Sequence, residues 1–270
     1  HNLNFEGEDR IDVINFIKEN RKNFSLGENL EFHLFEKANK LSLSFDEVAL
    51  GFNVYPINSL TYRAYPYLKS RLLHHKTEKF GYDPRRKELY VFNLTSSNKI
   101  IGFQVRALDN NGGPKYKTWN IERIYDRLKK PLNVNKEELD SLNKISMIFG
   151  ILTTDLSRQF TVFEGPIDSF FMSNTIGLTG VKKQILDFDD IPTVRYFFDN
   201  DIEGKSKMIQ KLKKGNTVFM WDKFLKDFRI PSKKVKDLND LVKYEYKHRT
   251  GCLATLDKYF TNNHLDLIFI

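Results

Sequence analysis

The chain has 270 residues, of which 40% are hydrophobic and 14% aromatic, which is typical of a folded protein with one large or two smaller domains. Its only cysteine, Cys252, excludes an intramolecular disulfide framework and a cysteine-based zinc site, so we expect no zinc and a cytoplasmic location. No apolar run approaches the roughly 18 residues of a membrane span, and residues 1–10 lack the pattern of a signal peptide, so we expect no membrane association. The first residue is His1 rather than Met, as expected of a fragment.

The formal net charge of +8 is unevenly distributed. Residues 52–130 contain 16 Lys and Arg against 6 Asp and Glu, and the remainder of the chain is nearly neutral. A local basic excess is typical of a surface that binds a phosphate backbone. A solvated basic surface would give the same count, so both interpretations stay open.

Residues 1–51 are predicted to form an N-terminal helical segment. Apolar residues recur at helical spacing in 8–20 and 28–38. Ser44 stands before an acidic first turn and predicts a capped helix that ends near Gly51. We find no candidate site in this segment and expect it to pack against the residues that follow.

Residues 52–150 are predicted to form a basic, mixed α+β subdomain. Runs of β-prone residues at 89–94 and 100–107 predict a hairpin, and a glycine-rich turn then leads into a short strand at 115–119. Two helices, at 121–130 and 136–149, are predicted to connect this subdomain to the next.

Basic and aromatic residues follow the glycine-rich turn. Arg106 lies near the end of one predicted strand, and Lys115, Tyr116 and Lys117 follow the turn. Glycines allow close approach of the backbone to a ligand, while the basic side chains suit phosphates and the tyrosine ring suits a base. An ordinary edge strand protected by lysines has the same pattern. Elsewhere in the segment, the adjacent His74 and His75 diverge on a helix or a strand, so we expect no metal role for them.

Residues 151–270 alternate between predicted strands and helices. Strands are expected near 160–165, 174–180, 193–199 and 216–221 and at the closing 265–270. Helices are expected through Phe170 and Phe171, after residue 180, and over 203–214, 238–246 and 254–260. This alternation is typical of βαβ units around a parallel sheet, so the fold class is predicted to be α/β, or α+β for the chain as a whole.

Acidic residues follow two of the predicted strands. Glu164 and Asp168 come after the first, and Asp199 and Asp201 after another. Because the carboxyl ends of parallel strands meet at one edge of a sheet, we expect these acids to lie close together. Their oxygens are ligands that Mg2+ prefers, and Mg2+ takes the rest of its shell from water and phosphates, which indicates phosphoryl chemistry. An isolated Asp-x-Asp is more often an ordinary turn, and the lysines of 205–214 also suit a solvated helix face.

The acidic segments have a specific resemblance. VFEGPID, residues 162–168, and FFDNDIEG, residues 197–204, resemble the Toprim domain, the metal-binding unit of bacterial-type DNA primases, topoisomerases and some nucleases. Upstream, residues 100–119 resemble the basic subdomain of primases, in which a Gly-Phe-x-x-Arg strand precedes Gly-Pro-Lys-Tyr. Downstream, KDLND, residues 236–240, resembles an element of phage primases. The resemblance covers residues 85–245.

The resemblance implies a DNA primase catalytic core, a nucleotidyltransferase that makes short RNA primers on single-stranded DNA from ribonucleoside triphosphates. It implies Mg2+ or Mn2+, as two ions, at a Toprim-type domain covering 151–270, and a template-binding role for the basic subdomain of 52–150. The implied catalytic and metal-binding acids are Glu164, Asp168, Asp199 and Asp201, with Asp237 and Asp240 as metal neighbours. The implied nucleic-acid or nucleotide-binding residues are Arg106, Lys115, Tyr116, Lys117 and Lys205.

Two parts of such primases have no counterpart in this sequence. The cysteine-rich zinc module is missing, and so is the helicase-binding or fused helicase part, since no Gly-x-x-x-x-Gly-Lys-Ser/Thr phosphate loop occurs. The resemblance implies a replicative helicase as partner. The compact form and KDLND indicate a phage or mobile-element origin. Two alternatives remain: a Toprim-type nuclease, and a non-catalytic nucleic-acid-binding replication protein.

Overall fold

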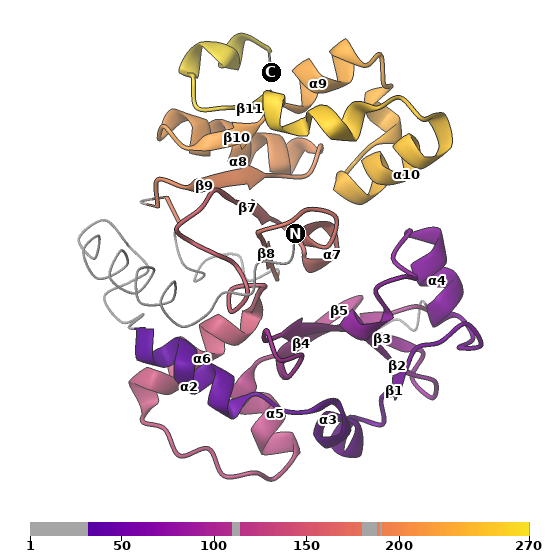
Figure 1. The fold of residues 1–270 in the computed structure, drawn as a ribbon, viewed down its shortest axis with the longest axis vertical. Coiled ribbons are helices and arrows are strands. Elements are labelled where there is room, and N and C mark those ends of the chain that lie inside the picture. The colour runs from indigo at the N-terminus through magenta and orange to yellow at the C-terminus, as the bar shows by residue number, and fades with distance from the viewer. Residues whose placement is uncertain (1–31, 110–113, 180–187, 190, 270) are drawn as a thin grey trace.

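The computed structural model describes residues 32–109, 114–179, 188–189 and 191–269. It contains a five-stranded antiparallel sheet from the first half of the chain and a six-stranded mixed sheet from the second half. Figure 1 shows the first sheet in the lower part of the molecule and the second in the upper part. The six-stranded sheet includes parallel strands linked through helices, so the predicted α/β class is confirmed.

Two helices, α2 (Phe32–Leu41) and α3 (Phe45–Phe52), precede the first sheet. The predicted cap of α3 is confirmed: the backbone N–H of Glu47 donates to Ser44 Oγ at 3.3 Å, and that of Ser44 donates to Glu47 Oε2 at 2.8 Å. The helix predicted over 8–20 lies outside the described residues, as does the start of the one predicted over 28–38.

The first sheet has its strands in chain order, and every neighbouring pair is antiparallel. The strands are β1 (Tyr55–Pro56), β2 (Phe80–Asp83), β3 (Glu88–Leu94), β4 (Ile100–Ala107) and β5 (Tyr116–Trp119). The predicted hairpin, β3 and β4, and the short strand after it are confirmed. The helix α4 (Ala64–Ser70) and a 3-10 turn (Thr77–Lys79) were not predicted, because Pro66 reads as a helix breaker although a helix tolerates proline in its first turn.

Two helices connect the sheets, α5 (Ile121–Arg127) and α6 (Lys136–Met147), as predicted. The second is shorter than expected, because its last two predicted residues form β6 (Ile148–Phe149), an edge strand of the second sheet. Asn93 of β3 is buried beside this junction. Its Nδ2 donates to the Ser146 and Ile148 carbonyls at 3.0 Å each, and its Oδ1 accepts from Gly150 N at 3.2 Å. One asparagine thus ties the first sheet to the start of the second.

The second sheet has the order β11-β10-β9-β7-β8-β6. Its further strands are β7 (Phe160–Phe163), β8 (Thr175–Leu178), β9 (Val194–Phe197), β10 (Thr217–Phe219) and β11 (Phe260–Thr261). The four central strands are parallel, and the chain goes from β7 to one side, β8, and then to the other side, β9. The connections after β7 and β9 therefore diverge, and α/β sheets bind ligands at the carboxyl ends of their strands where connections diverge in this way.

The remaining elements surround this sheet. They are α7 (Pro166–Ser169), α8 (Ile202–Lys213), α9 (Trp221–Asp227), α10 (Leu238–His248) and 3-10 segments at Ser232–Lys234, Cys252–Tyr259 and His264–Phe269. The strand predicted over 265–270 is wrong: an alternating apolar run needs a neighbouring strand, and β10 pairs with β11 instead. The helix predicted through Phe170 and Phe171 ends at Ser169, and the one predicted over 254–260 is a 3-10 segment followed by β11. The helix predicted after residue 180 falls on residues that are not described.

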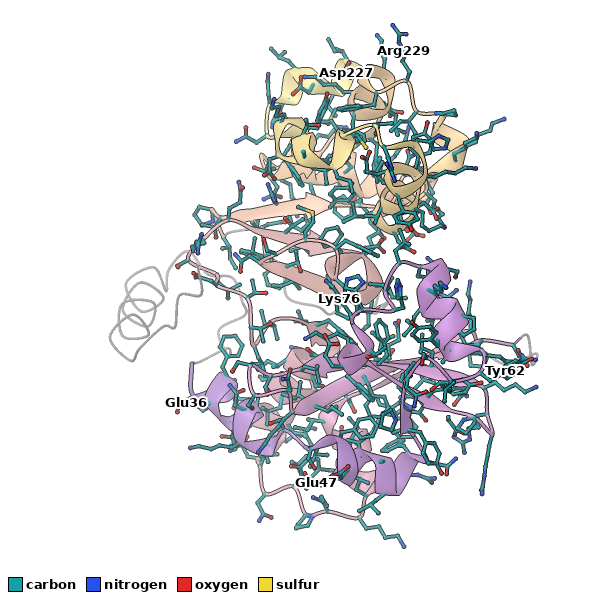
Figure 2. All side chains as sticks on the ribbon, turned by 45° about the vertical axis from the view of Figure 1, so that its right-hand side comes forward. Glu36, Glu47, Tyr62, Lys76, Asp227 and Arg229 are labelled. Carbon is teal, nitrogen blue, oxygen red and sulfur yellow. The ribbon has the colours of Figure 1, made fainter. Side chains whose placement is uncertain are left out.

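The two sheets share an apolar cluster, in which Leu68 and Phe80 of the first half pack with Phe149 and Ile167 of the second. The Phe80 and Phe170 rings meet edge to face, with centroids 5.6 Å apart. Lys76, which Figure 2 shows at this junction, donates a hydrogen bond to the Phe170 carbonyl. Packing thus sets how the first half of the chain, called the basic half for its excess of Lys and Arg in residues 52–130, faces the second half, which carries the clustered acids. Among the described helices none has the length and apolarity to cross a membrane.

Candidate functional site

The acids predicted to gather do so at the carboxyl ends of β7 and β9. Glu164 follows β7 directly, and Asp199 is the second residue after β9. The Asp199 N–H donates to Glu164 Oε1 at 3.1 Å, which joins the two strand ends. Asp201 caps α8, with its Oδ1 accepting from Gly204 N at 2.9 Å. Asp168 on α7 lies close enough that the charge of Asp199 perturbs it.

Three carboxyl groups lie where a negative charge is unfavourable: Asp168, Asp199 and Asp237, which caps α10. Burial raises the pKa of Asp199 to about 7, and the charges of Glu164 and Asp237 add to the effect. Burial also raises the pKa of Asp168, helped by the charge of Asp237. The pKa of Asp237 is raised by its own burial and by the charge of Asp240. Such a cluster favours a bound cation, because a cation would relieve the mutual repulsion.

Several carboxylate oxygens are open to a ligand. The Asp199 carboxylate accepts no hydrogen bond from a described residue. Asp168 uses Oδ1 alone, for Asn239 N at 2.9 Å, and Asp237 uses Oδ1 alone, for Asp240 N at 2.7 Å. Among the described residues, no three His, Cys, Asp or Glu side chains lie close enough to hold a metal by themselves. A divalent cation would therefore take much of its shell from water or phosphate oxygens, as Mg2+ commonly does.

The other predicted acids already have cationic partners. Glu164 Oε2 bonds to Lys207, and Asp201 Oδ2 lies 3.1 Å from Lys236 Nζ. The Gly204 hydrogen bond lowers the pKa of Asp201, and Lys236 lowers it further. Asp240 accepts a hydrogen bond from Lys243 on its own helix at 2.7 Å, so it does not share the open oxygens of Asp168, Asp199 and Asp237.

A cation from the basic half reaches the acids. Arg71, just after α4, donates from Nη1 to Asn239 Oδ1 at 2.8 Å, and Asn239 Nδ2 donates back to the Arg71 carbonyl at 2.8 Å. Asn239 is fully buried, and its backbone N–H is the one that holds Asp168. The charge of Arg71 lowers the pKa values of Asp168 and Asp237, against the larger effect of burial. Sequence patterns did not indicate Arg71, and the only sign of Asn239 was its place in KDLND.

Gly204 allows α8 to begin beside these acids. A Cβ atom at this position would lie 2.0 Å from the Asp199 carbonyl oxygen. Only glycine permits this approach of helix to strand end, which explains the Gly of FFDNDIEG.

The predicted nucleic-acid-binding residues of the basic half are divided between two faces of the edge strand β5. Arg106 and Tyr116 are cross-strand partners, the guanidinium donates to the Tyr116 hydroxyl, and it lies 5.2 Å from the Tyr67 ring centroid. Strand alternation places Lys117 on the other face, whereas Lys115, which precedes β5, has its Nζ 5.7 Å from the Tyr116 ring centroid. Both lysines are exposed, but Lys117 Nζ bonds Glu88 at 2.8 Å.

The lysines of α8 differ in their contacts. Lys205, predicted to contact a nucleotide, bonds both carboxylate oxygens of Asp222, at 2.8 and 2.6 Å, and is held by α9. Lys207, assigned from the sequence to the solvated face, is the lysine that bonds Glu164. Lys207 is therefore the α8 lysine nearest the acids.

No protein-family model and no curated protein matches the chain. Its structure is similar to that of the RNA polymerase domain of the Mycobacterium tuberculosis primase DnaG, with a TM-score of 0.44 and 16% identity over 94% of this chain and 84% of that one. The E. coli primase catalytic core gives a TM-score of 0.36 and 15% identity over 83% and 76%. The M. tuberculosis domain in complex with a double-stranded DNA oligomer with an overhang gives 0.42 and 16% over 94% and 81%. These structural neighbours are bacterial primase catalytic cores of low sequence identity.

Proposed function

We propose that this chain is a DNA primase catalytic core, a metal-dependent nucleotidyltransferase that makes short RNA primers on single-stranded DNA. One observation carries the proposal: Asp168, Asp199 and Asp237 gather at the strand ends of the second sheet with raised pKa values. These acids face a basic half through Arg71. The site thus has a place for cations beside a surface suited to a polyanion.

The acids suit two divalent cations, Mg2+ or Mn2+, in a Toprim-type site. Glu164, Asp168, Asp199 and Asp201 would hold them, with Asp237 beside them and Asp240 further out. Held there, such ions would supply Lewis acidity for a primer 3′-hydroxyl and positive charge for the leaving pyrophosphate. The open oxygens of Asp199, Asp168 and Asp237 fit this use, since carboxylate oxygens are preferred ligands of Mg2+.

The cations around the acids suit the substrates. Arg71 and Lys236 would bind oxygens of a ribonucleoside triphosphate, and Lys207 would keep Glu164 in place. In the basic half, Lys115 and Arg106 would bind phosphates of the template, and the half-exposed Tyr116 offers its ring to a base. We further propose a separate replicative helicase as partner and a phage or mobile-element origin, from the KDLND element.

Primer synthesis is the direct test. The chain is incubated with single-stranded DNA, labelled ribonucleotides and Mn2+, and the products are resolved on a denaturing gel. We expect short RNA from the wild type and a loss of about 100-fold or more in Glu164→Gln and Asp201→Asn. Glu137→Gln, an exposed glutamate at the start of α6, is the matched control and should retain activity.

The other outcomes identify the alternatives. Degraded template without new RNA would indicate a Toprim-type nuclease, in which the same acids activate water. Retained DNA binding with neither product would indicate a non-catalytic replication protein. Either result would overturn the primase assignment.

A further inference from the structure

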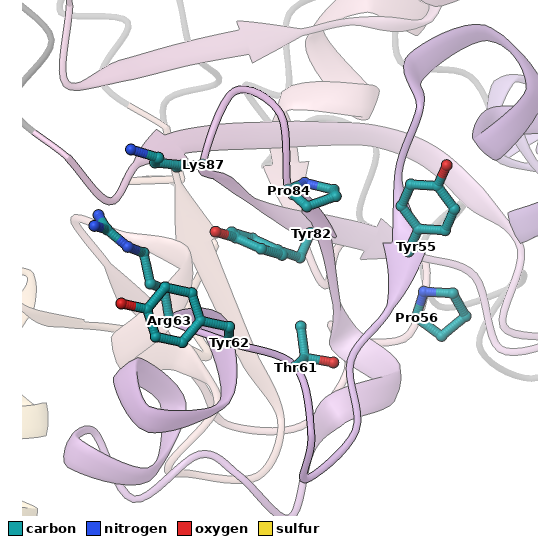
Figure 3. Close-up of a pocket in the computed structure, with 8 residues that line it drawn as sticks. All are labelled: Tyr55, Pro56, Thr61, Tyr62, Arg63, Tyr82, Pro84 and Lys87. Carbon is teal, nitrogen blue, oxygen red and sulfur yellow. The ribbon is translucent and has the colours of Figure 1, made fainter.

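A cavity of about 470 Å³ lies on the basic half, at the edge formed by β1 and β2 and at the loop before α4 (Figure 3). None of its residues is among the predicted site residues. They are Tyr55, Pro56, Thr61, Tyr62, Arg63, Tyr82, Pro84 and Lys87. Figure 3 shows Tyr62, Arg63 and Lys87 on one side of the hollow, Tyr55 and Pro56 on the other, and Tyr82 between them.

Two of the tyrosines that line the cavity are exposed to water. Tyr62 is 76% exposed and Tyr55 is 52% exposed. Tyr82, the cross-strand partner of Tyr55, is buried beneath them. Exposed aromatic rings gathered around a hollow are typical of a binding site rather than of a solvated surface.

The walls of the cavity are held by hydrogen bonds. Asp83 Oδ1 accepts from the backbone N–H groups of Arg85 at 2.8 Å and Arg86 at 3.1 Å, which fixes the turn that carries Pro84. On the other wall, Asn58 N donates to Thr61 Oγ1 at 3.0 Å, which closes the loop before Tyr62. The cavity is thus preformed, and a ligand would not have to order it.

The cavity has a positive charge. Arg63 and Lys87 share one acid, Asp109, whose Oδ2 lies 2.9 Å from Lys87 Nζ. Two cations against one carboxylate leave one positive charge, in a segment that already has the basic excess of the chain. A phosphate would match this excess, and the Arg63 guanidinium can bind it through two parallel hydrogen bonds.

Arg63 and Lys87 both have a positive backbone φ angle, which is uncommon for residues other than glycine. Arg63 has φ +64° and ψ −48°, and Ala64 N donates to the Tyr62 carbonyl at 2.8 Å, which is a γ-turn of the rare and strained hand. Lys87 has φ +55°. Strained non-glycine positions persist where the surrounding structure imposes them, and they cluster at ligand sites.

We propose that this cavity binds one nucleotide of a single-stranded nucleic acid, with the base against the exposed tyrosine rings and the phosphate at the N–H groups of Arg63 and Lys87 that do not hold Asp109. The cavity volume suits a ligand of this size, and stacking on tyrosine accepts any base. The choice of partner rests on the proposed function, but the binding requires neither the acids nor a metal. The cavity would hold the strand at a point separate from Lys115.

The test is fluorescence anisotropy of a labelled oligothymidylate of about 15 nucleotides in EDTA, so that no metal or catalysis is involved. Tyr62→Ala should raise the Kd about fivefold or more without changing its salt dependence. Arg63→Gly should raise the Kd and reduce the slope of log K against log salt by about 0.7, the effect of one lost phosphate contact. Because glycine adopts positive φ without strain, the Tm of Arg63→Gly should not fall.

The chain offers matched controls for both variants. Tyr246 on α10 is 74% exposed, and Arg229 is an exposed arginine with φ +54°. Figure 2 shows Arg229 at the top of the molecule and Tyr62 at the side of the lower half. Tyr246→Ala and Arg229→Gly should leave the Kd unchanged, and so should Glu164→Gln, which separates this proposal from the catalytic one.

Two results would overturn the proposal. One is an unchanged Kd in both Tyr62→Ala and Arg63→Gly. The other is a proline-rich peptide that binds the wild type and not Tyr62→Ala while oligothymidylate binding stays constant, because the cavity would then be a groove for extended proline segments. Neither result bears on primer synthesis.

Discussion

The pKa values of buried carboxyl groups are shifted in opposite directions at the two ends of the six-stranded sheet. Asp189, near the amino ends of β9 and β10, accepts from Lys211, from Lys214 at 2.8 Å and from the Tyr196 hydroxyl at 2.8 Å. Burial alone would raise the pKa of Asp189, but these donors lower it to about 2. At the carboxyl ends, burial and like charges raise the pKa of Asp199 to about 7. The same sheet can neutralise an acid fully, so the unmatched charge at its other end indicates a binding function.

The largest expected effect comes from removing one charge at each end. Asp199→Asn should lower primer synthesis about 100-fold or more and raise the free energy of unfolding by about 1 kcal/mol, because a repelled charge is lost. Asp189→Asn should leave activity per folded molecule unchanged and lower the free energy of unfolding by about 2 kcal/mol, because two lysines lose their partner. Urea unfolding and the primer assay measure both. Equal destabilisation by the two variants would contradict the view that the charge of Asp199 is unfavourable and that of Asp189 is stabilising.

The cation that the basic half supplies to the acids gives the next effect. Arg71→Met removes the positive charge facing Asp168 and Asp237, so Mn2+ should bind about fivefold more tightly while primer synthesis slows. Titration of Mn2+ by electron paramagnetic resonance measures the affinity. Arg71→Lys keeps the charge and should keep the wild-type affinity. Weaker Mn2+ binding in Arg71→Met would show that Arg71 acts only through packing.

Acid should affect the amino end of the sheet through Asp189. Its pKa in the folded state, about 2, lies below the ordinary value of 3.8, so its contribution is complete above pH 3.8 and is lost as the pH falls through 2. The difference corresponds to about 2 kcal/mol. Between about pH 5 and pH 2 the wild type should lose that much more stability than Asp189→Asn, as measured by urea unfolding. If the free energy of unfolding falls equally with pH in both proteins, Asp189 does not contribute to the acid sensitivity.

The smallest effect is expected on the edge strand of the basic half. Lys115→Ala should weaken single-stranded DNA binding and reduce the salt slope by about 0.7, because the exposed lysine loses one phosphate contact. Lys117→Ala should change binding less, since Glu88 already neutralises that lysine. Salt titration of anisotropy measures both slopes. A larger effect from Lys117 than from Lys115 would reverse the assignment.

Local patterns predicted the elements that depend on near neighbours. The cap at Ser44 and the hairpin of β3 and β4 follow from spacing over a few residues. The meeting of Glu164 with Asp199 follows from a rule about strand ends, which needs only the order of strands and helices.

Contacts between distant residues were not predictable in this way. Arg71 and Asn239 are 168 positions apart, and no period links them. The choice between Lys205 and Lys207 depends on how α8 is rotated against its neighbours, because two residues along a helix differ by about 200°. Tertiary packing sets that rotation, and it turned Lys205 toward Asp222.

The buried Asn239 has a consequence for attempts to divide this protein. A fragment of 148–269 would keep the acids but lose Arg71, leaving the Asn239 side chain with a broken pair of hydrogen bonds and exposing Ile167 to water. An unmatched buried amide destabilises a fold by about 1–3 kcal/mol. The fragment 148–269 is therefore a poor candidate for separate expression or for transplantation onto another DNA-binding module, and swaps between related chains should exchange Arg71 and Asn239 together.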